Sequence, residues 1–372
     1  MEAVIDAGIK RYYLSRQKRS VAALHREIKH DCQAADLPVP SVGTVRRRVA
    51  ALAPSVVMRA RNGAAAVRQR FKPLRGSLET EYPLDVVQID HTLVDVVAVD
   101  DVFRKPLGRV WLTVVLDVDT RVVCGFYMSP EHPSTTSVAL AITHAVLPKG
   151  PWLSANDLTL PWPAAGLPRC IHVDNAREFH SQAMMRACQQ HGIALEFRPV
   201  GRPHFGGHIE RLMGTLMTRI HELPGTTFSN IQERGDADPE ALAVLTLSEL
   251  QRVFALEVLG PYHHEVHSGL GMPPLAAWAE RLDRRSSPPL VPQNPDEFLY
   301  SFLPFKEVVV RREGIRLHSI FYYDNVITRW IGTGQVRLRA KYDPRNLFRV
   351  FLSSAPQLNE TPRKRTVSAD GV

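Results

Sequence analysis

The segment from residue 83 to about residue 223 alternates β-rich runs with amphipathic helical runs, and this limits the possible folds more than any other feature. Strands that alternate with crossover helices predict a mixed sheet with helices packed on it, so we expect an α/β core. The predicted strands are 84–90, 109–118, 120–129, 169–173 and 194–197, and the predicted helices are 134–147, 180–191 and 208–223.

An amphipathic helix is predicted at 19–35, and a second helix follows the N-cap residue Ser41 and runs to about residue 52. This pattern fits a helix-turn-helix and an ordinary helical hairpin equally well. The second helix carries Arg46, Arg47 and Arg48, which would contact DNA if it is a recognition helix. We expect residues 1–80 to form this helical DNA-binding region, with a basic connector from residue 53.

The core is expected to span 81–285 with trailing helices, before a proline-rich linker at 286–295. Short strands from Phe298 onward predict a small β-barrel at 296–355. Residues 306–349 hold ten basic and four acidic residues, so this barrel can also lie on DNA. The tail at 356–372 is expected to be disordered.

The charge of the chain is concentrated at one end. The formal net charge is +8, but residues 1–80 hold 16 Lys or Arg against 6 Asp or Glu, which leaves the remainder at −2. A basic segment suits a polyanion, because each neutralised phosphate releases condensed counterions. A merely solvated surface is the alternative.

Other classes of protein are disfavoured. No apolar run approaches the ~20 residues that span a bilayer, and the start of the chain has no apolar signal-peptide core. We therefore expect a cytoplasmic protein without a membrane contact. The four cysteines are scattered, so they predict buried thiols rather than disulfides or a thiolate zinc site.

Three acids stand at positions that suit catalysis. Asp90 closes a predicted strand, Asp174 follows another directly, and Glu210 opens a helix after two glycines. If the three carboxylates converge, their like charges must be neutralised by protons or by cations. A ligand set made only of oxygen atoms favours magnesium or manganese over zinc. Two such ions promote in-line phosphoryl displacement. Taken singly, each acid also has a structural interpretation. Asp90 fits a turn at the end of a strand, Asp174 an Asx turn, and Glu210 a charge that the helix dipole favours at a helix start.

The glycine-flanked loop at 201–207 lies just before Glu210. Its glycines permit close backbone approach, so we expect the loop to lie beside DNA; a plain turn is the alternative. It would bring Arg202, His204 and Arg211 near phosphates. The cluster His263, His264 and His267 resembles a zinc set, but without paired cysteines surface or packing roles are favoured.

The acids Asp90, Asp174 and Glu210, with 35 residues between the last two, resemble the DDE triad of the retroviral integrase and transposase superfamily. The strings VQIDHT, IHVDNAREF and GRPHFGGHIERLMGTL are most similar to the large bacterial transposases of the Mu, TnsB and TniA type. The strings PYHHEVHSGLGMPPLAAW and VRLRAKYDPRNLFRVF resemble the segments that follow the core in that family.

This resemblance implies an RNase H-like core, a Mu-type C-terminal barrel and a DNA transposase. Such an enzyme cleaves transposon 3′ ends and joins them to target DNA by metal-dependent transesterification. Asp90, Asp174 and Glu210 would be catalytic and would ligate two Mg²⁺ ions, with Mn²⁺ as a substitute. The implied partners are transposon-end and target DNA, further copies of the chain on that DNA, and an AAA+ target-selecting ATPase, which together imply association with the nucleoid.

Two other functions fit the same residues. One is an RNase H-fold nuclease that hydrolyses DNA without joining it, and the other is a catalytically idle DNA-binding protein that represses its own element. The His and Cys spacing of the retroviral N-terminal zinc module is absent from the sequence, which disfavours a retroviral-type integrase. About 80 residues precede the core, fewer than the N-terminal arrays usual in the resembling group.

Overall fold

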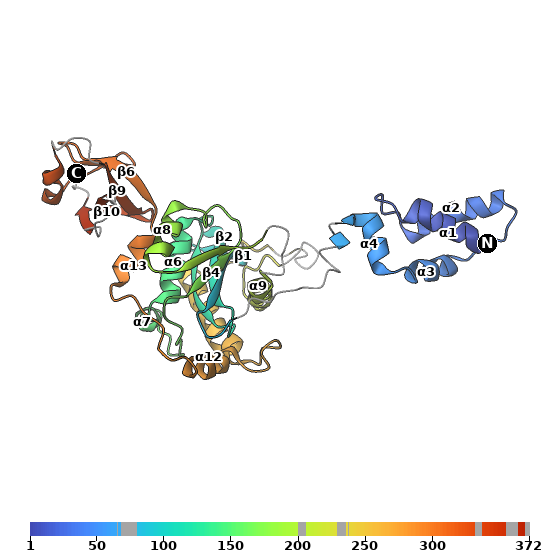
Figure 1. Cartoon of the computed structure of the whole chain (residues 1–372), viewed down its shortest axis with the longest axis horizontal. Helices are drawn as coiled ribbons and strands as arrows, with labels where there is room; N and C mark the ends of the chain where they lie inside the picture. Colours follow the sequence, from blue (N-terminus) through green and yellow to red (C-terminus); the bar gives the residue numbers. More distant parts are fainter. Residues whose placement is uncertain are drawn as a thin grey trace. The chain divides into compact units, whose positions relative to one another are not determined.

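The computed structural model describes residues 1–64, 66–67, 80–199, 206–228, 236, 238–331, 337–354 and 364–368. The chain divides into two compact units, Met1–Ser77 and Leu78–Val372. Figure 1 labels many of the elements of both units.

The N-terminal unit is helical. Both predicted helices are confirmed, and Ser20 and Ser41 cap them by accepting hydrogen bonds from Ala23 N (3.2 Å) and Thr44 N (3.1 Å). Its buried core consists of Ile5, Ile9, Leu24, Ile28, Cys32 and Val45. Its helices are α1 (Glu2–Gly8), η1 (Ile9–Tyr13), α2 (Val21–Ala34), α3 (Val42–Ala50) and α4 (Pro54–Asn62).

A connector was expected from residue 53, but Pro54–Asn62 form helix α4. Pro54 occupies the first turn of α4, where its missing N–H has no helical partner to lose. The helix has no fully buried residue, so it lacks the apolar pattern by which a helix is recognised in sequence.

The core of the larger unit is built on a five-stranded mixed sheet of order β3-β2-β1-β4-β5. β1 pairs antiparallel with β2 and parallel with β4, and β4 pairs parallel with β5. This order and these directions confirm the expected α/β, RNase H-like architecture. The strands are β1 (Val86–Val99), β2 (Pro106–Asp117), β3 (Val123–Ser129), β4 (Cys170–Val173) and β5 (Ala194–Phe197).

Helices cover both faces of this sheet (Figure 1). α6 packs on β2 and β3, whereas α9 packs along β1. The described helices of the core are α6 (Thr135–Val146), α7 (Gly150–Ala155), α8 (Gln182–Gln190), α9 (Gly207–Ile220), α11 (Leu247–Glu257), η3 (Val258–Tyr262) and α12 (Pro274–Asp283).

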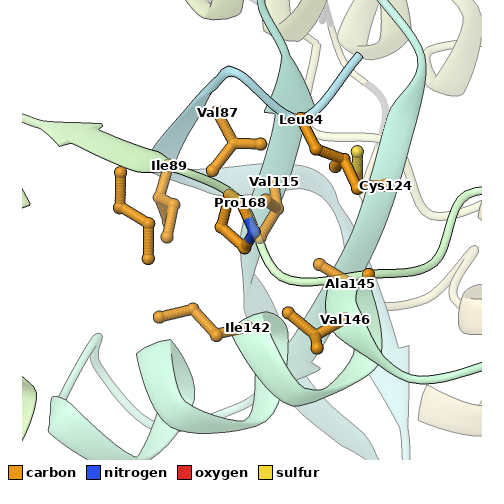
Figure 2. Close-up of a pocket in the computed structure, with 11 residues that line it drawn as sticks. Leu84, Val87, Ile89, Val115, Cys124, Ile142, Ala145, Val146 and Pro168 are labelled. Carbon is orange, nitrogen blue, oxygen red and sulfur yellow. The ribbon is translucent and has the colours of Figure 1, made fainter. Parts of the chain in front are cut away.

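A small apolar pocket lies between the sheet and α6 (Figure 2). Val87 and Ile89 of β1 and Ile142 of α6 line it, and no charged or amide side chain does so among the residues described around it. Such a lining offers a ligand no polar anchor, so the pocket is a packing gap. Because side chains alternate along a strand, Gln88 and Asp90 lie on the opposite face of β1.

The C-terminal strands have their own buried core, centred on Ile315, Leu338 and Val350. They form a four-stranded sheet of order β11-β10-β9-β6 and a separate β7-β8 hairpin. The elements of this module are α13 (Pro295–Phe302), β6 (Phe305–Val309), β7 (Ile315–Leu317), β8 (Ile320–Tyr322), η4 (Asn325–Trp330), β9 (Arg337–Asp343), β10 (Asn346–Ser354) and β11 (Lys364–Ser368).

Two expectations for this region were wrong. Residues 296–302, placed at the start of the barrel, belong to helix α13, because Asn294 caps it, Pro295 sits in its first turn, and Phe298 and Phe302 are buried four residues apart. The tail expected to be disordered contains β11, which pairs with β10. The run Thr366 and Val367 supplies β-branched residues there, although the tail is too polar for alternation to reveal a strand.

Candidate active site

Asp90 lies within β1 and not at its end, so the expectation that it closes a strand was wrong. β1 continues because residues 91–99 remain rich in β-branched side chains, with a shift of register between Leu93 and Val97. The pairing of β1 with β4 stops at Gln88, opposite His172. Asp90 therefore lies just beyond the last residue of β1 that β4 covers.

Asp174 directly follows β4, as the sequence predicted. Its Oδ1 accepts a hydrogen bond from Ala176 N at 3.0 Å, which is the Asx turn considered as the alternative function of this residue. The turn engages one carboxylate oxygen. The structure thus places Asp174 in a turn and, because parallel strands β1 and β4 are neighbours, beside Asp90.

Glu210 lies in the first turn of α9, the helix that packs on β1. Helix α9 starts after Gly206, which provides no side-chain cap. A Cβ placed on Gly206 would lie 2.7 Å from Oε1 of Glu210 and 2.5 Å from Nη1 of Arg198. Glu210 and Arg198 therefore approach each other at this glycine, where a larger residue would displace the end of one or both side chains.

Arg198 joins the acids, although sequence reasoning did not single it out. Its Nη1 donates to Oδ2 of Asp90 at 3.2 Å, and its side chain is only 10% exposed. Its Nε and Nη2 are buried without a hydrogen-bond partner among the described residues. The backbone N–H of Arg198 donates to the carbonyl of Val173 (2.7 Å), which fixes the arginine beside the end of β4.

The electrostatics of the site follow from burial. Burial raises the pKa of Asp90 above its usual value, the Arg198 charge opposes this, and nearby Asp174 adds to it. Burial and the Arg198 charge together lower the pKa of His172, on the same face, to about 4. These shifts place Asp90, Asp174 and Arg198 within electrostatic reach of one another.

His91 and Glu178 form a second polar pair beside the acids. Nε2 of His91 lies 3.3 Å from Oε1 of Glu178, and its ring stacks on Phe179 at 5.2 Å between centroids. Burial lowers the pKa of His91, while Glu178 and Asp174 oppose this shift. These contacts connect the segment after Asp174 to β1. A strand histidine followed far away by an acid gives no signal in sequence that could reveal this contact.

The donor set suits a hard divalent cation in its chemistry. All three acids offer oxygen ligands, and a buried carboxyl beside a second one needs a positive charge to ionise fully. Here the Arg198 guanidinium provides that charge. In the described part of the chain, no three His, Cys, Asp or Glu side chains are already arranged to hold a metal ion.

The remaining predicted residues lie in several places. Arg211 is exposed on α9, next to Glu210. Arg202 and His204 lie outside the described residues. In the N-terminal unit, Arg46 and Arg47 are exposed on α3, while Arg48 donates to Glu2 through Nε (2.9 Å) and Nη2 (2.7 Å).

The three clustered histidines have different surroundings. His263 is fully buried and its Nε2 accepts from Val123 N (3.1 Å), whereas His264 is exposed and His267 is half-buried. All four cysteines are buried and free, as expected. None of the helices in the described ranges is both long and apolar enough to cross a membrane.

Solved structures with a similar fold include retroviral integrases. The simian T-cell lymphotropic virus intasome, in complex with PP2A regulatory subunit B56 gamma, is 12% identical, with a TM-score of 0.37 over 88% of this chain and 92% of that chain. The catalytic core domain of BIV integrase is 17% identical, with a TM-score of 0.31 over 53% of this chain and 94% of that chain.

The similarities in sequence point to bacterial transposases. The Tn552 transposase of Staphylococcus aureus is 26% identical over 351 residues, which cover 94% of this chain and 68% of the relative. The Tn7 transposition protein TnsB of Escherichia coli is 25% identical over 312 residues, 77% of this chain and 44% of the relative. The chain thus spans about two thirds of one relative and less than half of the other.

Two family models match along the chain. Residues 88–225, which include all three acids, match the TnsB C-terminal domain, and residues 300–357 match the C-terminal domain of Mu transposase. Both models describe transposase domains, and the chain is similar to two transposases over most of its length, so the comparisons support a Mu/TnsB-type transposase.

Proposed function

We propose that this chain is a DDE transposase that cleaves the 3′ ends of a transposon and joins them to target DNA. The observation that carries the proposal is the meeting of Asp90 and Glu210 at the Arg198 guanidinium, with Asp174 beside them. The Arg198 guanidinium donates to Asp90 and lies close to Glu210 at Gly206, and a buried charged cluster of this kind supports a functional site.

Asp90, Asp174 and Glu210 would hold a pair of Mg²⁺ ions, with Mn²⁺ as a substitute. Bound there, the pair would activate the attacking oxygen and stabilise the leaving oxygen of an in-line phosphoryl transfer. Arg198 would leave Asp90 as the site fills and would remain near enough to contact a phosphate. Asp174 would keep its Asx turn, which orients its carboxylate toward Asp90.

The other parts of the proposal concern DNA and partners. The exposed Arg46 and Arg47, the basic N-terminal residues and Arg211 beside Glu210 would bind transposon-end DNA, with Arg202 and His204 as further contacts predicted from the sequence. Assembly of several copies on paired ends and cooperation with an AAA+ ATPase rest on the resemblance to the Mu/TnsB group.

The decisive experiment uses a precleaved donor end, taken from the DNA that borders the gene and ending in a 3′-OH. Incubated with plasmid and MgCl₂, the full chain should produce joined products, and Asp174→Asn should abolish both joining and end cleavage. Binding of the end in a gel shift should remain. Asp157→Asn is the matched control, because this side chain is 86% exposed and its one ion pair with a described residue is a 4.0 Å contact with Arg252.

The alternatives give different results in the same assay. Hydrolysis of DNA without joined products would indicate a nuclease, and end binding without metal-dependent cleavage would indicate a repressor. Joining by Asp174→Asn at the level of the unsubstituted chain would refute the assignment of the acids.

A further inference from the structure

Four basic side chains gather beside the first turn of α9: Arg121, His208, Arg211 and His267. Nη2 of Arg121 lies 3.3 Å from Nε2 of His208. Burial and then the charges of Arg121 and Arg211 lower the pKa of His267. The four groups therefore lie within electrostatic reach of one another.

Three segments far apart in sequence build this cluster. Arg121 lies between β2 and β3 with φ +63°, and its carbonyl accepts from the Tyr262 hydroxyl at 2.9 Å. His208 and Arg211 lie on α9, on either side of Glu210. His267 follows η3, and its Nδ1 accepts from Gly269 N at 3.1 Å. A left-handed backbone at a bulky residue is costly, so the position of Arg121 is imposed by its surroundings.

Donors in the cluster remain without acceptors. Nε and Nη1 of Arg121 are buried, and neither has a hydrogen-bond partner in the parts of the chain that are described. Buried donors of this kind normally have a partner, because leaving them unpaired opposes folding. Burial also lowers the pKa of the Arg121 guanidinium, although the charges of Asp117 and Asp119 oppose this shift.

No carboxylate neutralises the cluster. Within the described ranges none of the four side chains forms an ion pair at 4.0 Å or less. Asp117 and Asp119 are near Arg121 but are engaged elsewhere. Asp117 accepts from Leu84 N (2.9 Å) and Thr120 N (2.8 Å), and Asp119 pairs with Arg281 at 2.8 Å.

The start of α9 adds to the positive potential. Its N-cap, Gly206, offers no side-chain acceptor to the first helical N–H groups. These groups and the helix dipole favour an anion at this end of the helix. The start of the helix therefore adds a partial positive charge to the charges of the two arginines.

We propose that Arg121, His208, Arg211 and His267 form a binding site for one backbone phosphate of the DNA strand that enters the acidic site. The inference rests on the proposed function, because that function supplies the DNA. A phosphodiester offers acceptor oxygens to the Arg121 donors and replaces the missing counter-charge. Since His208 and Arg211 lie in the same helical turn as Glu210 but on a different side of α9, the bound phosphate would hold the strand one step away from the acids.

The test measures binding of a fluorescein-labelled duplex by anisotropy across a series of KCl concentrations, with EDTA present so that no cleavage occurs. Arg121→Gln and Arg211→Gln should each lower the slope of log K against log salt by about 0.9 and weaken binding roughly tenfold. Arg252→Gln on α11 is the matched control. Arg211 is exposed, so its variant decides the question if Arg121→Gln does not fold.

Three outcomes are distinguished. Loss of slope in the cluster variants and not in Arg252→Gln supports the site. Slopes equal to that of the control overturn it. Inorganic phosphate is the second probe: stabilisation of the unsubstituted chain against heat that Arg121→Gln loses, with DNA slopes unchanged, would assign the cluster to a free anion and also overturn the proposal. Because no metal is present, failure here leaves the joining assay, and with it the proposed function, untouched.

Discussion

Arg198 is the cation that contacts the candidate site: it donates to Asp90 and lies close to Glu210. It lies after β5, but its guanidinium reaches Asp90 on β1 and the first turn of α9, so one side chain links three elements. Two of its nitrogens have no acceptor in the described structure, which means that the contact is not fully satisfied. A residue held in this way can yield its place to a cation at low cost.

The first prediction concerns this charge. Arg198→Ala should lower the stability of the chain in EDTA by about 1–3 kcal/mol, because Asp90 and Asp174 lose their counter-charge. The same variant should gain more stability than the unsubstituted chain when MgCl₂ is added, because no guanidinium competes with the ion. Thermal unfolding in EDTA and in MgCl₂ measures both effects.

Arg252→Ala is the control for this prediction, since its partner Asp157 is 4.0 Å away and 86% exposed. It should change neither the stability in EDTA nor the response to MgCl₂. Equal responses of Arg198→Ala and the unsubstituted chain would show that Arg198 does not occupy the cation site.

The acids were predictable from sequence and Arg198 was not, for a physical reason. Asp174 and Glu210 each stand at the end of a local pattern, a β-branched run or a glycine pair followed by a helix. Arg198 acts through contacts with Asp90, 108 positions earlier, which no local pattern encodes. The same holds for Arg121, whose importance comes from the α9 residues that surround it.

At the scale of elements, the close approach of β3 and α6 depends on Gly125. A Cβ at this position would lie 2.5 Å from the backbone N of Ala145 and 2.8 Å from the carbonyl carbon of His144. Backbone atoms inside a helix cannot move aside as a flexible side chain can. The glycine is therefore required by space and not by an unusual φ.

The second prediction follows from this contact. Gly125→Ala should destabilise the core by about 1–3 kcal/mol, because the helix must shift away from the sheet. Gly150→Ala, at a glycine with no atom within 4 Å of the added Cβ, should change stability far less. Urea unfolding followed by tryptophan fluorescence compares them, and equal stabilities of the two variants would disprove the packing argument.

The third prediction concerns His263, which ties the segment after η3 to β3. Burial lowers the pKa of His263 from 6.5 to about 3. The unfolded chain therefore binds more protons than the folded chain between these values, so stability is present above pH 6.5 and is lost as the pH falls toward 3. At pH 5 the unfolded imidazole is mostly protonated, and the cost should be about 2 kcal/mol.

Unfolding in urea at pH 7.5 and pH 5.0 tests this dependence. His263→Gln keeps an acceptor for Val123 N but cannot ionise, so it should lose about 2 kcal/mol less than the unsubstituted chain over the same interval. His30→Gln, at a side chain that is 84% exposed, serves as the control. Parallel losses in all three proteins would show that His263 can be protonated in the fold.

Element boundaries show what local patterns can and cannot predict. Helices α6 and α8 lie within the predicted ranges, because Ser134 and Ser181 cap amphipathic runs. The continuation of β1 beyond Asp90 was missed, since the irregular pairing between Leu93 and Val97 breaks the alternation that marks a strand. Bulges are set by the partner strand, so one strand's sequence does not reveal them.

At the scale of the whole molecule, charge and chemistry are divided between the two units. Residues 1–80 carry 16 basic and 6 acidic residues, whereas the acids of the candidate site lie in the unit Leu78–Val372. The N-terminal unit therefore offers DNA a positive surface without a cluster of acids. This division predicts that affinity for DNA and catalysis can be changed independently.

The fourth prediction tests that division on α3. The double variant Arg46→Gln, Arg47→Gln should lower the slope of log K against log salt by about 2, because two exposed cations are lost. Arg48→Gln should lower it less, since Glu2 already holds this guanidinium at 2.7 Å. Joining of a precleaved end at saturating DNA should stay unchanged in all variants, because the acids are untouched. An unchanged slope in the double variant would instead favour an ordinary helical hairpin over a DNA-reading helix.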